Sequence, residues 1–235
     1  MNVSGKKAVV FGGTSGIGLA AAQMLADGGA SVIVVSRDPS KTEQRSPEIT
    51  TRSCDVLDGA AVEALLTDIG PIDILVSSAT GGDRAIGPFL EMDMEGYKAS
   101  FDKLWGYANV VRYGASHVAD GGSITLVSGA PARNCQPGQS ALSSVGGAVE
   151  AMVRAVAREF APRIRINVVS PGIIDTPMVS AQGAEREALY DEMTRNHLIP
   201  RAGTATEVAE GILFVIKNDF VTGTTVDVDG GWLLS

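Results

Sequence analysis

Cysteine and histidine are scarce in this sequence, with two residues of each among 235. Cys54 and Cys135 are too few for a disulfide framework, and together with His117 and His197 they show no metal-ligand spacing. We therefore expect neither a disulfide bond nor a bound metal ion.

The sequence also lacks a surplus of basic residues and any apolar run of membrane-spanning length. Lysine and arginine number 19 against 27 acidic residues, which gives a net charge of −8. Because proteins neutralise a phosphate backbone with clusters of Lys and Arg, nucleic acid is not an expected partner. The N-terminal segment runs into a strand pattern without a secretory signal, so a cytoplasmic protein with no membrane partner is expected.

What the sequence does contain is a regular alternation of short apolar runs and helical patterns. Such alternation predicts an α/β fold, a single Rossmann-type domain over residues 1–235 with a doubly wound parallel sheet flanked by helices. The polar stretch at about 177–201 is predicted to form a lid. Strands are expected at 7–11, 30–35, 49–54, 72–77, 123–127, 164–169 and 224–228, and helices at 17–27, 59–69, 97–118, 141–160 and 207–216.

A glycine-rich segment lies between the first expected strand and the first expected helix. Glycines permit a tight turn and a close backbone approach, and the free N–H groups of a helix N-terminus suit a pyrophosphate. The position between strand and helix is what gives this pattern its specificity. The candidate phosphate-binding residues are Gly12, Thr14, Ser15, Gly16 and Ile17.

Arg37 stands at the end of the second expected strand, where a site that prefers NAD usually has an acidic residue for the ribose 2′-hydroxyl. Asp38 comes one residue later. An arginine at this place can pair with a 2′-phosphate, which favours NADP(H) over NAD(H). The alternative is a solvated surface arginine.

Four segments carry motifs that occur together in one protein family. They are Gly12-Gly13-Thr14-Ser15-Gly16-Ile17-Gly18, Cys54-Asp55-Val56, Pro171-Gly172-Ile173-Ile174-Asp175-Thr176 and Asp229-Gly230-Gly231. With them, the whole chain resembles the short-chain dehydrogenase/reductase family, although Phe11 replaces the threonine that begins the family's glycine motif.

This resemblance implies a path for the cofactor along the sheet. Asp55 and Val56 would hold the adenine, Ser78 and Ala79 would lie near the adenine ribose, and Ile174 and Thr176 would contact the carboxamide end. Asp55 could equally be a helix cap.

The residues that carry the family's chemistry are missing. Gly129, Leu142 and Gly146 stand where the family has its catalytic serine, tyrosine and lysine. The loss does not depend on the alignment, because no tyrosine or lysine occurs between Gly129 and Glu150. Loss of a positioned general acid typically costs about two to four powers of ten in rate, so ordinary ketone reduction by the family's mechanism is disfavoured.

Lys103 stands where the resemblance places the family's asparagine, and it is the candidate catalytic residue. A long cationic side chain could supply a charge or a proton in the space vacated at Gly129 and Gly146; the alternative is a surface or interface lysine. The candidate substrate-pocket residues are Gly129, Arg133, Leu142 and Gly146.

Three functions remain open from the sequence. The first is an NADP(H)-dependent oxidoreductase of atypical mechanism that acts on a small carbonyl or alcohol substrate. The second is an inactive NADP(H)-binding sensor or partner subunit, and the third is a redox-neutral lyase or isomerase that uses the remodelled pocket. The resemblance also implies a homo-oligomer, a tetramer or a dimer, built through the expected helices at 97–118 and 141–160.

Overall fold

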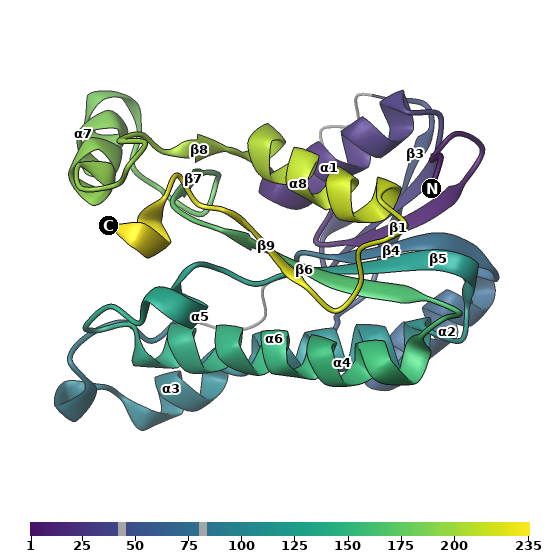
Figure 1. Ribbon diagram of the computed structural model, residues 1–235, viewed down its shortest axis with the longest axis horizontal. Helices are drawn as coiled ribbons and strands as arrows, with labels where there is room; N and C mark the ends of the chain where they lie inside the picture. The colour runs from purple at the N-terminus through teal and green to yellow at the C-terminus, as the bar shows by residue number, and fades with distance from the viewer. Residues whose placement is uncertain (42–45, 80–83) are drawn as a thin grey trace.

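A seven-stranded parallel sheet forms the centre of the protein (Figure 1), as the computed structural model shows for residues 1–41, 46–79 and 84–235. The order of its strands is β3-β2-β1-β4-β5-β6-β9. This confirms the doubly wound Rossmann-type fold. The strands are β1 (Lys7–Phe11), β2 (Ser31–Ser36), β3 (Ile49–Ser53), β4 (Ile72–Ser77), β5 (Val118–Val127), β6 (Arg165–Pro171) and β9 (Thr225–Val228).

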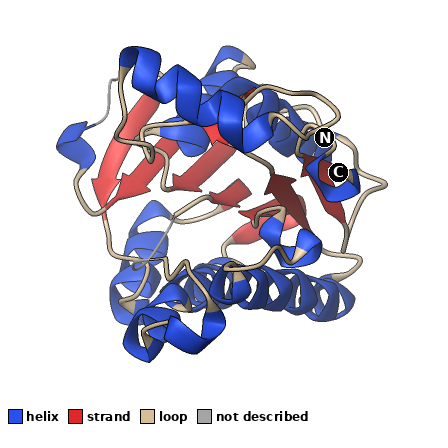
Figure 2. Ribbon diagram, turned by 90° about the vertical axis from the view of Figure 1, so that its left-hand side faces the viewer, coloured by secondary structure: helices blue, strands red, loops and turns tan. Residues whose placement is uncertain are grey.

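Helices cover both faces of the sheet, as Figures 1 and 2 show. α1 (Gly16–Asp27) and α8 (Ala205–Lys217) lie on one face, and α2 (Gly59–Ile69), α4 (Asp102–Gly114) and α6 (Ser140–Phe160) lie on the other. Successive side chains of a strand point to opposite faces of the sheet. Each strand therefore contributes residues to the apolar core on both faces. In β1, Val9 and Phe11 pack toward α2, α4 and α6, whereas Ala8 and Val10 pack toward α1 and α8.

Most of the shorter elements, among them α3, α5, α7 and the C-terminal η3, lie on the left of Figure 1. The predicted lid segment contains a helix, α7, and two short strands at its borders pair with each other. Among the helices of the described chain, none is both long enough and apolar enough to cross a bilayer. The shorter elements are η1 (Pro39–Lys41), η2 (Phe89–Glu91), α3 (Met94–Ser100), α5 (Pro131–Asn134), β7 (Ile174–Asp175), α7 (Gly183–Thr194), β8 (Gly203–Thr204) and η3 (Trp232–Leu234).

The long helix expected at 97–118 is wrong in its extent. The structure divides it into α3 and α4, which meet at Phe101, and α4 ends at Gly114. Val118 belongs instead to β5, where it pairs with Ile72 of β4. The spacing of apolar residues continues past Gly114, but strand pairing with β4 determines the structure there. β5 therefore begins five residues before the expected start of the strand at Ser123.

Candidate functional site

One cleft of about 700 Å³ runs along the carboxyl ends of the strands, where the order of the sheet reverses between β1 and β4. The structure brings all twelve candidate cofactor residues to the lining of this cleft. What they bind stays a prediction. The twelve are Gly12, Thr14, Ser15, Gly16, Ile17, Arg37, Asp55, Val56, Ser78, Ala79, Ile174 and Thr176.

The glycine turn after β1 packs directly against the end of β4. Gly12 has a φ of +74°, and a Cβ atom added there would lie 2.6 Å from the backbone nitrogen of Ala79. The Ser78 hydroxyl donates a hydrogen bond to the carbonyl oxygen of Gly12 at 3.2 Å. Only glycine fits both the backbone conformation and this approach, so the turn can lie flat beneath a ligand.

Helix α1 begins at the floor of the cleft. Its N-cap residue, Ser15, has an extended backbone, and its side chain makes no capping hydrogen bond within the described chain. The first N–H groups of a helix have no partners inside the helix, and together with the helix dipole they favour an anion. The turn and the helix end therefore form a surface that can accept a phosphate group.

At the predicted adenine end, Arg37 lines the cleft beside Asp55. Asp38 is engaged locally, because its carboxylate accepts a hydrogen bond from the backbone N–H of Ser40 at 3.2 Å. The alternative that Asp55 caps a helix is wrong. The N-cap of α2 is Asp58, which accepts from the N–H of Ala61 at 3.0 Å, whereas Asp55 accepts from the N–H of Leu57 in a turn before that helix.

Lys103 extends from α4 into the other end of the cleft. Its Nζ donates a hydrogen bond to the carbonyl oxygen of Ser128 at 3.0 Å and lies 5.6 Å from the centre of the Tyr107 ring. Burial, and then the nearby charge of Arg84, lower the pKa of Lys103 from 10.5 to about 8. Lys103 is therefore half-buried in the lining of the cleft next to Gly129, and it is not a fully solvated surface lysine; the alternative of an interface lysine stays a prediction.

Tyr107 is not a substitute for the missing catalytic tyrosine. It is fully buried, and its hydroxyl donates to the carbonyl oxygen of Val127 at 2.8 Å. Burial raises the pKa of this hydroxyl. The Tyr107 ring faces the Lys103 amine in a cation–π contact. Tyr107 is not among the described residues that line the cleft.

The two glycines at the missing catalytic positions differ in their surroundings. A Cβ atom at Gly129 would have its nearest neighbour, Cδ of Pro131, at 3.5 Å, which is ordinary contact. At Gly146, a Cβ atom would lie 2.7 Å from Cβ of Ala132 in α5. The prediction that both glycines vacate space is thus correct only at Gly129. Although Gly146 borders the cleft, α5 fills the place next to it.

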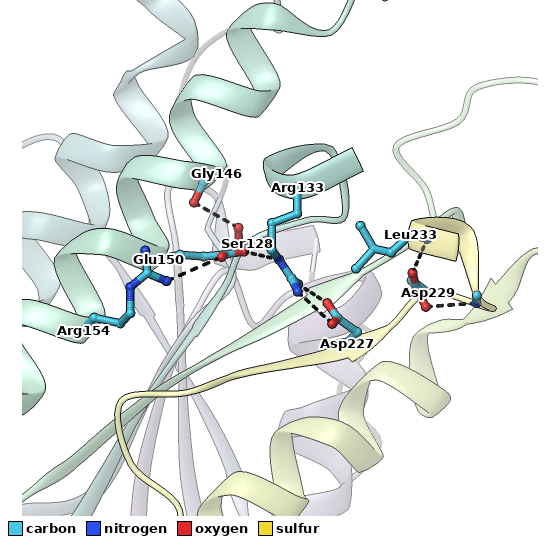
Figure 3. A network of polar contacts seen from close by, with 9 residues as sticks. Ser128, Arg133, Gly146, Glu150, Arg154, Asp227, Asp229 and Leu233 are labelled. Atoms are coloured by element: carbon cyan, nitrogen blue, oxygen red, sulfur yellow. Dashed lines mark hydrogen bonds and ion pairs between the residues drawn. The ribbon is translucent and has the colours of Figure 1, made fainter. Parts of the chain in front are cut away.

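Arg133 is a correction to the candidate pocket residues. It is not among the residues of the described chain that line the cleft. Figure 3 shows its guanidinium between Asp227 of β9 and Glu150 of α6. Nη1 donates to Asp227 at 2.9 Å and Nε donates to Glu150 at 3.2 Å, and Glu150 also pairs with Arg154. These ion pairs connect α5 to β9 of the sheet and to α6.

The sequence reasoning missed several residues of the lining. Arg84 lies in the segment after β4, and its guanidinium contacts the sulfur of Met178 at 3.5 Å. Its position after the glycines of that loop was the only signal available. Met178, Tyr190 and Met193 come from the lid segment, and Trp232 comes from η3.

An ion pair between Arg186 of α7 and Asp175 of β7 connects the lid segment to the strand that precedes it. Arg186 also donates to the carbonyl oxygen of Thr176 at 2.7 Å, and the hydroxyl of Tyr190 bonds to Asp175 at 3.2 Å. These contacts place α7 beside Thr176, which the family resemblance assigns to the carboxamide end of the cofactor. The segment therefore covers the same end of the cleft as Lys103.

Comparison with known proteins identifies relatives of the whole chain. A family model described as enoyl-(acyl carrier protein) reductase matches residues 12–233. The L-xylulose reductase of Bos taurus is 30% identical, with 99% of this chain and 98% of that protein covered. Carbonyl reductase [NADPH] 2 of Sus scrofa is also 30% identical, with 100% and 99% covered. A crystal structure of a small-chain dehydrogenase in complex with NADPH superposes with a TM-score of 0.83 at 30% identity, covering 99% of this chain and 100% of that one.

The packing of α5 can be tested with two adjacent glycines of α6. Gly147→Ala should stabilise the protein by about 0.5–1 kcal/mol, because nothing lies within 4 Å of the new Cβ atom and alanine favours a helix. Gly146→Ala gains the same propensity but is overpacked against Ala132, which typically costs about 1–3 kcal/mol. Urea denaturation measures both free energies of unfolding. Equal stabilisation by the two changes would show that α5 does not pack on Gly146.

Proposed function

The chain belongs to the short-chain dehydrogenase/reductase family, and we propose that it is an NADP(H)-dependent oxidoreductase of small carbonyl or alcohol substrates in which Lys103 takes over proton transfer. The observation that carries the proposal is the position of the Lys103 amine, which lies in the cleft 3.0 Å from the carbonyl oxygen of Ser128.

Binding of the cofactor is supported by the form of the cleft. The turn at Gly12 and the open N-terminus of α1 suit the pyrophosphate, and Asp55 and Thr176 mark the adenine and carboxamide ends of the same cleft. Similar proteins of about the same length are described as carbonyl reductase [NADPH] 2 and as a small-chain dehydrogenase in complex with NADPH.

The preference for NADP(H) is argued from Arg37. Its side chain lines the cleft at the end of β2, and within the described residues it makes no ion pair that would occupy it. A guanidinium can form charge-assisted hydrogen bonds with a 2′-phosphate, whereas NAD(H) offers it a hydroxyl.

Replacement of Arg37 tests this preference. Arg37→Ser should weaken NADPH binding about 10–100-fold, because a hydrogen bond to a charged group contributes about 1.5–3 kcal/mol, and should change NADH binding little. Fluorescence titration of both cofactors measures the two affinities. Arg52→Ser, which removes an exposed arginine of β3 outside the cleft lining, is the matched control. An equal loss for both cofactors would contradict the role of Arg37.

Proton transfer in the proposed reaction follows from the place of Lys103. Bound NADPH would supply the hydride to the carbonyl carbon. The Lys103 ammonium, directed to the open space at Gly129, donates a proton to the carbonyl oxygen as the alcohol forms, and the neutral amine then regains a proton from solvent. In the reverse direction the neutral amine accepts the proton of an alcohol.

The lowered pKa of Lys103 suits this role. A general acid is most effective when its pKa lies near the working pH, and a lysine at its ordinary value would hold its proton too firmly. The groups that face the amine are Arg84, which lowers its pKa, the Tyr107 ring, and the carbonyl oxygen of Ser128.

Substitution of Lys103 tests the proposed proton donor. Lys103→Met should lower kcat/KM for carbonyl reduction by about two to four powers of ten. For the native protein, reduction should be constant below pH 8 and should fall as pH rises through about 8, where the ammonium is lost; the variant should lack this limb. Lys98→Met, an exposed lysine of α3, is the control. Full activity of Lys103→Met with intact NADPH binding would overturn the proposal.

A second candidate function is an NADP(H)-binding protein without turnover. It is favoured by the contact between α5 and Gly146, because the place of the family's lysine is filled rather than vacant. NADPH binding by the native protein without oxidation of NADPH by any member of a panel of carbonyl compounds would support this candidate over the enzyme.

A homo-oligomer is proposed through α4 and α6, with a tetramer as the expected state. These two helices border a mainly apolar groove of about 390 Å³. Its lining includes Val111, Met152, Val156 and Phe160, together with the charged residues Arg112, Glu159 and Arg163. Burial of this groove against a second copy would remove apolar surface from water.

Sedimentation velocity tests the assembly. At micromolar concentration the native protein should sediment as a tetramer or dimer, and Val156→Arg should shift it toward a smaller species, because a charge would then face an apolar groove. Thermal unfolding checks that the variant still folds. A monomeric native protein would contradict the proposed assembly.

A further inference from the structure

The substrate end of the cleft carries positive charge that no acid of the described chain balances. The lining contains three cations, Arg37, Arg84 and Lys103, and one acid, Asp55. The whole chain has the opposite balance, with a net charge of −8. Arg37 is assigned above to the cofactor, and Asp55 lies at the adenine end. Arg84 and Lys103 therefore remain without an assigned anion.

Within the described chain, Arg84 and Lys103 lack the carboxylate partner that several arginines of the protein have. Arg133, Arg186 and Arg201 each form an ion pair with a carboxylate. Throughout residues 1–41, 46–79 and 84–235, neither Arg84 nor Lys103 has such a partner: Arg84 contacts the thioether of Met178, and Lys103 donates to a backbone carbonyl. Asp83, the neighbour of Arg84 in the chain, lies outside the described residues.

Both cations line the same cleft. The charge of Arg84 contributes to the lowered pKa of Lys103, which means that the two like charges repel each other. An anion between or beside them would remove this repulsion, and a guanidinium is well suited to bind a carboxylate with two parallel hydrogen bonds. The neighbouring side chains of Ile86, Met178 and Trp232 offer apolar contacts for a short carbon chain.

We propose that the substrate is a carbonyl compound that carries a carboxylate, with the carboxylate bound by Arg84 and the carbonyl oxygen directed to Lys103. This inference rests on the proposed oxidoreductase function and names its substrate class. In this arrangement Arg84 binds the carboxylate of the substrate, and Lys103 transfers the proton.

Binding can be measured without turnover by pairing oxidised cofactor with oxidised substrate. The protein is loaded with NADP⁺, and 2-oxo acids of three to six carbons are titrated by isothermal calorimetry beside their methyl esters. The acids should bind about tenfold or more tightly than the esters, since only the acids offer a charged partner to Arg84. In Arg84→Gln this preference should fall to near unity. In Arg52→Gln, which removes an arginine outside the cleft lining, the preference should be unchanged.

The outcomes separate this inference from the proposed function. Normal NADP⁺ binding with equal or no binding of acids and esters would overturn the substrate class alone. Weaker NADP⁺ binding in Arg84→Gln, with the preference for acids retained, would show that Arg84 binds a phosphate of the cofactor and would also overturn it. Failure of the native protein to bind NADP⁺ or NADPH would overturn the proposed function and the inference together.

Discussion

The substrate end of the cleft depends on one contact, the packing of Ala132 in α5 against Gly146 in α6. Glycine is required there because any side chain would meet the short helix. α5 is fixed in turn by Arg133, which joins it to the buried carboxylate of Glu150 and to Asp227 at the far edge of the sheet. The absence of a lysine from this position is therefore part of a packed arrangement and leaves no hole in the site.

This arrangement determines where chemistry can take place. With the space beside Gly146 filled, the open part of the site lies at Gly129, and the residue that reaches its neighbourhood is Lys103, on α4, which bonds to Ser128. The family's lysine would have come from α6. A cation thus lines the same cleft from a different helix, and the proposed proton transfer rests on this position.

The sequence predicted the sheet, because buried parallel strands appear as apolar runs and glycine motifs mark their ends. The prediction from the sequence was wrong at Val118. The spacing of apolar residues there is typical of a helix, but pairing with Ile72 makes Val118 part of a strand. It also placed Arg133 in the pocket from its loop position, since the pairing with Asp227, nearly a hundred residues away, leaves no local signal. Arg84 was missed for the opposite reason, because no motif marks its segment.

The surroundings of Lys103 are the strongest indication that the cleft is a functional site. A half-buried cation loses part of its hydration, and a methionine in the same place would avoid that cost. One hydrogen bond to Ser128 and the face of the Tyr107 ring offset part of that cost, but no carboxylate of the described chain does so, and Arg84 adds repulsion. Strongly perturbed ionisable groups of this kind in a cleft occur mainly at functional sites. A lysine of lowered pKa in the cleft therefore favours the proposed proton transfer over a protein that only holds a nucleotide.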